Sequence, residues 1–381
     1  MTARIEEARL VSLAATPKTI WLFVELVLDD GRSGWGEASL EGQEAAVRDV
    51  AETVLAELAG QPFSTPEAMT APLPFATLAS AALSSAVAQA LWDLDAQLAG
   101  VSLAERLGGR RRERIGLYAN INRRTRDRSV EGVAASAREA WAAGFRALKI
   151  APFDEVRPDL ARAEMRAAME PGLARAFAIR EALGPDVRLM LDCHWRFDAE
   201  GARELIDACR DFAPYWIECP VDETPDAAGT IKSLRARANG AGIRLAGLET
   251  QILTDGFRPY VLAGAYDVMM PDVKYAGGPA EMLLIADFFA SHNVAFSPHN
   301  PTGPICHMHS LHVCAALPDS DLLEHQFDET PVFGAIVGGD VPPTQQGFAV
   351  PDWSRPGLSV ALHSGSGAAE EVLFSRGDLQ P

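Results

Sequence analysis

The sequence predicts an α/β fold, in which a TIM-type (β/α)₇₋₈ barrel carries an α+β N-terminal capping domain. The chain has 381 residues, of which 48% are hydrophobic, so it can bury the core of a barrel and of a smaller domain. From Arg114 onward, short apolar runs alternate with amphipathic helical stretches, as in parallel sheets with crossover helices. Polar residues end these apolar runs at intervals that suit one strand and one helix.

The N-terminal part, residues 1–113, is expected to form the capping domain. Residues 20–38 contain two apolar runs on either side of DDGRSG, a pattern typical of two strands joined by a turn. Ala-rich helices follow, and the clearest of them spans residues 79–100 and ends at Gly100. These helices recur to about Gly109.

The barrel is expected over residues 114–343. The candidate strands lie at residues 115–121, 146–150, 187–192, 215–218, 243–249, 266–272, 294–299 and 322–325. Seven or eight strands of this kind fit a closed barrel better than an open sheet. The remaining stretch, from about residue 344 to 381, is rich in proline and glycine, and we expect it to return to the capping domain and complete it.

Composition excludes several classes of function. The formal net charge of −18 argues against nucleic-acid binding, because phosphate contacts need a basic surface. Neither an apolar run long enough to span a bilayer nor a secretory signal is recognisable, so a cytoplasmic protein without membrane contact is expected. The five cysteines form no CxxC pair and are expected to be reduced thiols.

Three carboxylates end three successive apolar runs. Asp192 follows VRLML, Glu218 follows YWI and Glu249 follows IRLAGL, at intervals of 26 and 31 residues. The carboxyl ends of barrel strands converge on one mouth, so these side chains should lie together. Neighbouring carboxylates repel each other unless a cation joins them, and an oxygen-only set suits Mg²⁺. One Mg²⁺ per chain is therefore predicted.

The same rhythm continues through four further polar residues. Asp272, His299 and Glu324 end the next three runs, and Lys149 ends an earlier one. A carboxylate beside a histidine can fix its tautomer and raise its basicity, as a general base requires. A lysine near a metal can hold a substrate carboxylate while negative charge grows on it.

Together these motifs resemble the enolase superfamily, and within it the mandelate racemase subgroup. GWGEA, AQALWDLDAQLAG and LAERLGG resemble its capping domain. The segments that resemble its barrel motifs are LKI, LDCH, WIECP, LET, MPDVKYAGG, SPHNPTGP and LLEHQ. The resemblance covers almost the whole chain and implies a small carboxylate as substrate.

By position, the resemblance implies a role for each strand-end residue. It makes Asp192, Glu218 and Glu249 the metal ligands and Asp272 with His299 the catalytic dyad. Glu324 matches the acid that hydrogen-bonds a substrate carboxylate oxygen. The muconate-lactonising and dipeptide-epimerase branches carry a lysine where this chain has Asp272, so the racemase and dehydratase branch is favoured.

Two departures from the subgroup favour dehydration. Lys149 is followed two residues later by Ala151 instead of a second lysine, so two-base racemisation loses its usual partner. His194 follows Asp192 by two residues, as in sugar-acid dehydratases of the galactonate dehydratase kind. The resemblance then implies that His299 removes the α-proton, that Mg²⁺ and Lys149 stabilise the enediolate, and that His194 assists loss of the β-hydroxyl. The product would be a 2-keto-3-deoxy acid.

Several alternatives stay open at this point. Arg196 and Lys274 are candidate substrate-binding residues, because a strand period of two places them on the faces of Asp192 and Asp272. The competing activities are a racemase, epimerase or cycloisomerase that uses Lys149 and His299, and a non-catalytic binding protein. Cysteines and histidines over residues 306–314 suggest zinc, but they match no standard spacing. A homo-oligomer is expected from similar proteins.

Overall fold

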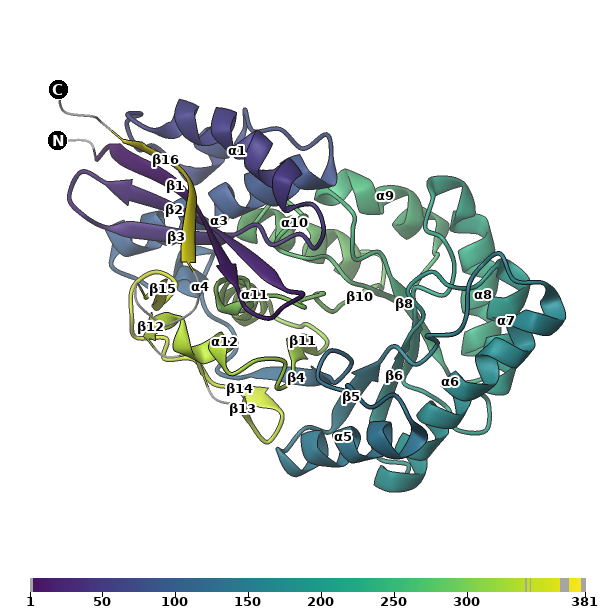
Figure 1. Cartoon of the computed structure of the whole chain (residues 1–381). Helices are drawn as coiled ribbons and strands as arrows, with labels where there is room; N and C mark the ends of the chain where they lie inside the picture. The colour runs from purple at the N-terminus through teal and green to yellow at the C-terminus, as the bar shows by residue number, and fades with distance from the viewer. Residues whose placement is uncertain (1–2, 340, 343, 364–369, 378–381) are drawn as a thin grey trace.

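The computed structural model describes residues 3–339, 341–342, 344–363 and 370–377. The chain forms an α+β cap and a barrel that lie against each other (Figure 1). Parts of the segment predicted to complete the cap, residues 364–369 and 378–381, lie outside the described residues, as do residues 1–2. Among the described residues, no helix is long and apolar enough to cross a membrane.

The cap is built on an antiparallel sheet in the order β16-β1-β2-β3. Its strands are β1 (Ile5–Ala14), β2 (Ile20–Leu28), β3 (Ser33–Glu37) and β16 (Glu370–Gly377). The predicted pair of strands around DDGRSG is confirmed as β2 and β3, and Gly31 takes a φ of 84° in the turn. β1 was not predicted. The last described strand, β16, pairs with β1 and so brings the C-terminal segment to the cap sheet (Figure 1).

Helices cover one face of the cap sheet. α1 (Glu44–Leu58) and α3 (Leu78–Ala99) lie on the sheet, and α2 (Pro66–Thr70) and α4 (Leu103–Arg106) pack on α3. The predicted long helix is confirmed as α3, which begins at a Thr77 capping box and ends at Gly100 in the left-handed conformation. It packs tightly on β3, because a Cβ added at Gly36 would lie 1.9 Å from the Ala86 carbonyl oxygen.

Eight parallel strands are described in the barrel, at the upper limit of the seven or eight predicted. They are β4 (Ile115–Asn120), β5 (Ala147–Ile150), β6 (Arg188–Asp192), β7 (Trp216–Glu218), β8 (Arg244–Gly247), β9 (Val268–Met269), β10 (Ala295–Phe296) and β11 (Leu323–Gln326). Each pairs with the next from β4 to β10, and β11 pairs with β4. A hydrogen bond from Asp321 N to Phe296 O at 2.8 Å links β11 to β10 and closes the ring.

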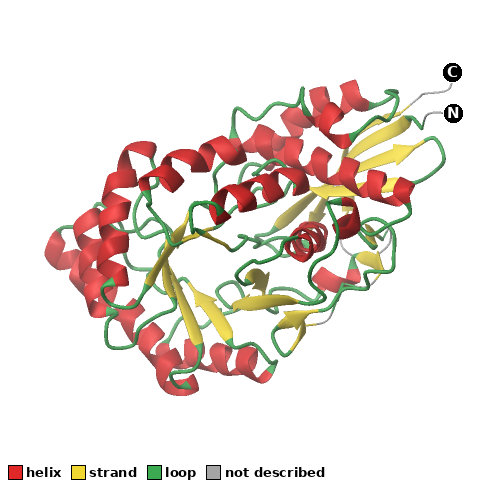
Figure 2. Ribbon diagram, turned by 180° about the vertical axis from the view of Figure 1, so that it is seen from behind, coloured by secondary structure: helices red, strands yellow, loops and turns green. Residues whose placement is uncertain are grey.

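Helices surround the strands on the outside (Figure 2). They are α5 (Val130–Ala142), α6 (Arg162–Leu183), α7 (Ala199–Ala208), α8 (Ala228–Asn239), α9 (Leu253–Ala263), α10 (Pro279–Ala290) and α11 (Pro304–Ala316), with a short 3₁₀ turn η1 (Pro225–Ala227) before α8. The following segment contains α12 (Val332–Ala335), β12 (Val337–Gly339), β13 (Thr344–Gln345), β14 (Phe348–Ala349) and β15 (Val360–Leu362). β14 pairs with barrel strand β4, so the C-terminal segment contacts the barrel before it reaches the cap.

The barrel interior has an apolar layer below a polar one. Tyr118, Met190 and Trp216 belong to a buried cluster inside the strands. Because side chains alternate between the two faces of a strand, the residue two positions further on points inward as well. This residue is Asp192 for Met190 and Glu218 for Trp216, so the carboxylates lie directly above the packed apolar layer.

One buried carboxylate joins the cap to the barrel. Glu37, at the end of β3, accepts hydrogen bonds from Thr302 Oγ1 at 2.6 Å, Gly303 N at 2.8 Å and Cys306 N at 3.0 Å. These donors lie at the start of α11, where backbone N–H groups have no partner within the helix. The cap therefore supplies the N-terminal cap of a barrel helix.

Candidate active site

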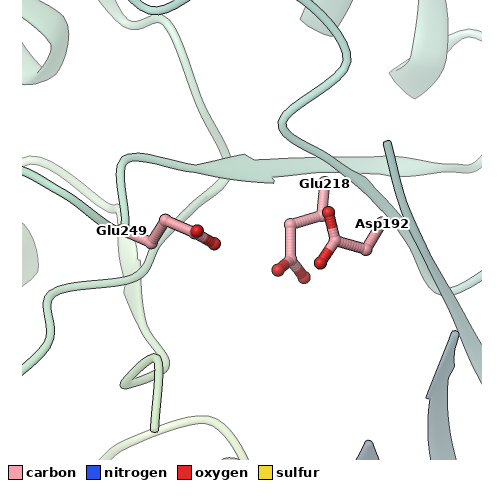
Figure 3. A group of neighbouring side chains, drawn as sticks. All are labelled: Asp192, Glu218 and Glu249. Carbon is pink, nitrogen blue, oxygen red and sulfur yellow. The ribbon is translucent and has the colours of Figure 1, made fainter. Parts of the chain in front are cut away.

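The structure brings the three predicted metal ligands together. Asp192 ends β6, Glu218 ends β7 and Glu249 lies two residues beyond β8, and one oxygen of each lies within 4.8 Å of the others. Figure 3 shows the carboxylate of Glu249 pointing toward the other two. All three side chains are buried, and among the described residues they form the one group of acidic, histidine or cysteine side chains found with this metal-binding geometry.

Lys149 lies beneath this group and pairs with several acids at once. Its Nζ is 2.5 Å from Glu218 Oε1, 3.0 Å from Glu324 Oε1 and 3.6 Å from Asp192 Oδ2. The lysine side chain is 1% exposed. Burial alone would lower its pKa, but the surrounding carboxylates raise the pKa well above its usual value. Lys149 therefore contributes a fixed positive charge to the site.

The acids differ in how strongly they hold a proton. Burial raises the pKa of Glu218 well above its usual value despite the opposing effect of Lys149, because Asp192 and Glu324 add their negative charges. Burial likewise raises the pKa of Glu249. Burial also acts on Asp192, but His194 and Lys149 outweigh it and lower its pKa. The site holds more negative charge than its own cations neutralise.

The residues present fit a divalent cation. All three candidate ligands offer carboxylate oxygens, the hard donors that Mg²⁺ prefers. Oε2 of Glu249 is buried without a hydrogen-bond partner among the described residues, and His299 Nε2 lies 3.4 Å from it. A buried carboxylate oxygen without a hydrogen bond is costly, and a bound cation would remove that cost.

The predicted dyad forms next to Glu249. His299 Nδ1 lies 2.8 Å from Asp272 Oδ2, and Lys274 Nζ lies 3.3 Å from the same oxygen. Burial by itself lowers the pKa of His299, but Glu249 and the hydrogen bond to Asp272 raise it above its usual value. With Nδ1 bound to Asp272, Nε2 is the nitrogen left to accept a proton.

His194 lies beside the metal ligands, although not by the strand alternation used to predict it. β6 ends at Asp192, and the chain then turns through left-handed residues, His194 at φ 46° and Trp195 at φ 57°. The turn brings His194 Nε2 to 3.0 Å from Asp192 Oδ2, and this carboxylate raises the pKa of the imidazole. His194 is 40% exposed at its side chain and faces the cavity.

Arg196 is not brought into the site. The strand ends at Asp192, so the alternation of side chains that was expected to place Arg196 on the same face as Asp192 does not continue. The guanidinium instead donates to the carbonyl oxygens of Asp154 and Val156, each at 3.1 Å. Lys274, in contrast, lines the cavity and is buried.

Glu324 is held as an anion by its neighbours. It accepts from Asn120 Nδ2 at 2.7 Å and from Asn300 N at 3.0 Å, besides its contact with Lys149. Burial opposes ionisation, but Lys149 and His299 lower the pKa of Glu324 to about 2. An ionised carboxylate only accepts hydrogen bonds, so the predicted bond to a substrate carboxylate requires Glu324 to take up a proton.

A cavity of about 560 Å³ joins the barrel mouth to the cap. From the barrel it is lined by Lys149, Asp192, His194, Trp195, Glu249, Lys274, His299 and Glu324, and from the cap by Thr19, Ile20, Trp21, Ser39, Leu40 and Glu41. Arg123 also lines it and pairs with Glu329 at 3.2 Å. This volume suits a small molecule with polar groups along its length.

The histidines of the region that suggested zinc serve separate partners. His307 Nδ1 lies 2.9 Å from Asn300 Nδ2, and His309 Nε2 lies 2.9 Å from Trp35 O. His312 Nδ1 accepts from Ala104 N at 3.1 Å. These imidazoles are buried packing groups on different faces of α11, and no metal-ligating group was found there among the described residues.

Comparison with known families decides the identity of this architecture. Residues 132–366 match the model of the enolase C-terminal domain-like family, and residues 4–108 match the N-terminal domain of mandelate racemase and muconate lactonizing enzyme. The chain belongs to the enolase superfamily. The predicted resemblance is thereby confirmed, as is the predicted combination of a capping domain and a barrel.

Relatives within the superfamily include sugar-acid dehydratases. The D-galactonate dehydratase of Ralstonia pickettii is 30% identical, over 80% of this chain and 77% of its own length. That of Verminephrobacter eiseniae is 29% identical, over 90% and 89%. The D-gluconate dehydratase of Thermoproteus tenax is 30% identical, over 74% and 55%.

Solved structures of the superfamily share the whole fold. A member from Salmonella Typhimurium superposes with a TM-score of 0.85 at 24% identity, over 98% of this chain and all of that one. An enolase protein from Sargasso Sea environmental sequences gives 0.82 at 27% identity, over 98% and 99%.

Some residues around the superfamily site were not predicted from the sequence. Asn120 ends β4, as Asp192 ends β6, so its place in the strand rhythm could have identified it. Arg123 and Trp195 lie in loops and reach the cavity through turns that carry no periodic signal. Glu223 is buried beneath the ligand loops, five residues after Glu218, and only its contacts reveal it.

Proposed function

We propose that this enzyme dehydrates a sugar acid, an aldonate or an aldarate, to a 2-keto-3-deoxy acid with Mg²⁺ as cofactor. The observation that carries the proposal is one cavity lined by both a base and a leaving-group acid. His299 with Asp272 supplies the base, and His194 beside Asp192 supplies the acid. The dehydratases similar to this chain support the same reaction.

The first step is removal of the proton from the carbon next to the substrate carboxylate. Nε2 of His299 accepts this proton, and the Asp272 carboxylate holds the Nδ1–H and stabilises the imidazolium that forms. Because the imidazole is buried, it is fixed in one orientation and shielded from bulk water.

Charge stabilisation makes this weakly acidic proton removable. Held by Asp192, Glu218 and Glu249, Mg²⁺ would supply positive charge next to the substrate carboxylate as negative charge moves onto it. The Lys149 ammonium adds a second fixed cation that cannot move away, since it pairs with acids on three sides.

The second step breaks the bond between the β-carbon and its hydroxyl group. The electron pair of the former C–H bond forms the new double bond, and the hydroxyl leaves with a proton from His194 as water. The resulting enol takes up a proton at the β-carbon, releases the proton of its 2-hydroxyl group and becomes a 2-keto acid. His194 suits this role because Asp192 raises the pKa of the imidazole, which favours its protonated form.

The epimerase alternative needs a second base opposite His299. Lys149 would have to be neutral and free to approach the substrate, but its Nζ is bound to acids in a fully buried position. Dehydration requires Lys149 only as a fixed positive charge, and this agrees better with its buried, ion-paired position.

The test is a panel of aldonic and aldaric acids incubated with the protein and Mg²⁺, with 2-keto acids as the readout. The wild type should form a keto acid from at least one member, and EDTA should abolish it. His299→Asn should lower the rate by about 100-fold or more, since the general base is lost. His292→Asn, an exposed histidine after α10, is the matched control and should keep full activity.

The other outcomes separate the alternatives. Solvent deuterium that enters the α-position without keto-acid formation would replace dehydration by epimerisation. Ligand binding that is independent of metal, with neither keto acid nor deuterium, would support a non-catalytic barrel.

The proposal extends to the location and assembly of the protein. We propose a cytoplasmic enzyme, which agrees with five buried cysteines that are all free. A homo-oligomer remains an expectation, and sedimentation equilibrium would test it.

A further inference from the structure

The loops that present the metal ligands adopt an unusual backbone conformation. His194 and Trp195 follow Asp192, Cys219 follows Glu218 and Leu248 precedes Glu249, and these four residues have φ between 44° and 70°. Left-handed backbone costs roughly 1 kcal/mol or more for a residue with a side chain, so something must hold it.

Glu223 contacts all three loops. Its Oε2 accepts from Trp195 Nε1 at 2.8 Å, and its Oε1 accepts from Leu248 N at 2.8 Å. The Cys219 thiol lies 3.8 Å from Oε1, within the range of a weak S–H hydrogen bond. Tyr266 fills the remaining acceptor position, with its hydroxyl 2.6 Å from Oε1.

The surroundings leave Glu223 little freedom. Its side chain is buried, and its own carbonyl oxygen accepts a hydrogen bond from the hydroxyl of Tyr260. A Cβ at Gly247, the residue before Leu248, would lie 2.2 Å from Glu223 Oε1, so only glycine allows the carboxylate to approach this close. The metal ligands themselves accept no hydrogen bond from Glu223.

We propose that Glu223 is a positioning residue that holds the three ligand loops in register and thereby sets the metal affinity of the site without contacting the metal. The inference rests on the proposed metal centre. Without the hydrogen bonds of Glu223, the ligand carboxylates would move apart, because their mutual repulsion opposes the arrangement that a cation needs.

The contacts predict a specific defect for Glu223→Gln. One amide oxygen can still accept from Leu248 N and Tyr266, but the amide nitrogen then faces the indole N–H of Trp195. Two donors cannot bond each other. Trp195→Phe removes that indole N–H, so the double variant should relieve part of the defect.

The experiment measures Mn²⁺ binding to chelator-stripped protein, with free Mn²⁺ followed by electron paramagnetic resonance. Burial raises the pKa of Glu223 to about 7, so pH 8 keeps the carboxylate ionised. Glu223→Gln should raise the Kd about 10-fold or more, as expected for loss of a group that orients metal ligands. Trp195→Phe should raise it about five-fold, the effect of one hydrogen bond. The double variant should bind no more weakly than Glu223→Gln.

The control is Asp93→Asn in α3, a buried carboxylate that accepts from Trp35 N and Leu358 N in the cap. This variant should change thermal stability and leave the Kd for Mn²⁺ unchanged, which separates positioning from general loss of stability. If Glu223→Gln does not fold, Trp195→Phe alone decides the inference.

Three results would overturn the inference. The first is that Glu223→Gln or Trp195→Phe binds Mn²⁺ with the same Kd as wild type. The second is that the increase in Kd of the double variant equals the product of the increases in the two single variants. The third is absence of Mn²⁺ binding by the wild type, which would remove the proposed metal centre as well. Normal wild-type binding with an unaffected variant removes the positioning role alone.

Discussion

Replacing Lys149 by methionine tests the charge balance of the site. The change removes one cation from a group in which Lys149 Nζ lies 2.5 Å from Glu218 and 3.0 Å from Glu324. Methionine keeps the length and most of the apolar volume of lysine, so the contact with the Tyr118 ring should be kept. The loss is therefore chiefly electrostatic.

The magnitude follows from burial. Removing one partner of a buried ion pair costs about 3–5 kcal/mol, because the charge left behind has no compensation. An unfolding entropy of about 2.1 cal/mol/K per residue amounts to about 0.8 kcal/mol/K for 381 residues. The metal-free Lys149→Met protein should accordingly melt about 4–6 °C below the wild type.

Calorimetry of chelator-treated protein would measure this difference. Lys232→Met is the control, because Lys232 is exposed on α8 and its loss should change stability by less than about 0.5 kcal/mol. Saturating Mg²⁺ should reduce the difference in melting temperature between Lys149→Met and wild type, since the ion replaces the lost positive charge. Equal melting temperatures without metal would refute the idea that Lys149 offsets charge repulsion among the acids.

Two further predictions concern the cap. Burial raises the pKa of Asp93 from 3.8 to about 6, so its stabilising contribution is present below pH 3.8 and is lost as pH rises through 6. Urea unfolding should show that wild type loses about 2 kcal/mol relative to Asp93→Asn between pH 4 and 7, and parallel profiles would contradict it. Gly36→Ala should cost about 1–3 kcal/mol in urea because of the clash with Ala86 O, whereas Gly229→Ala on α8, with open space around it, should not destabilise.

The barrel and its acidic group were predictable because one periodic rule governs both. Asp192 and Glu218 are the last residues of their strands, so strand spacing alone places them side by side. Asp272 and His299 lie a few residues beyond theirs, and the same rule extends to them because the strands are parallel and in register.

Prediction failed where the chain leaves the strands. Strand alternation was extended to Arg196, but the left-handed turn at His194 and Trp195 ends the alternation. β1 also escaped prediction, because a shift of register after Leu10 interrupts its alternating pattern. Glu223 has no sequence signature at all, since its role depends on donors that come from three separate loops.

The bond of Glu37 to the start of α11 limits how substrate can enter. If the cap swung open as one body, α11 would lose the acceptor of its first N–H groups and a carboxylate would stay unpartnered in the core. Entry to the cavity must then depend on short movements of the segments around residues 19–20 and 39–41, which line it from the cap. These segments can vary in sequence while the sheet, α11 and the acidic group stay fixed, so new substrates can be admitted without any change in the chemistry below.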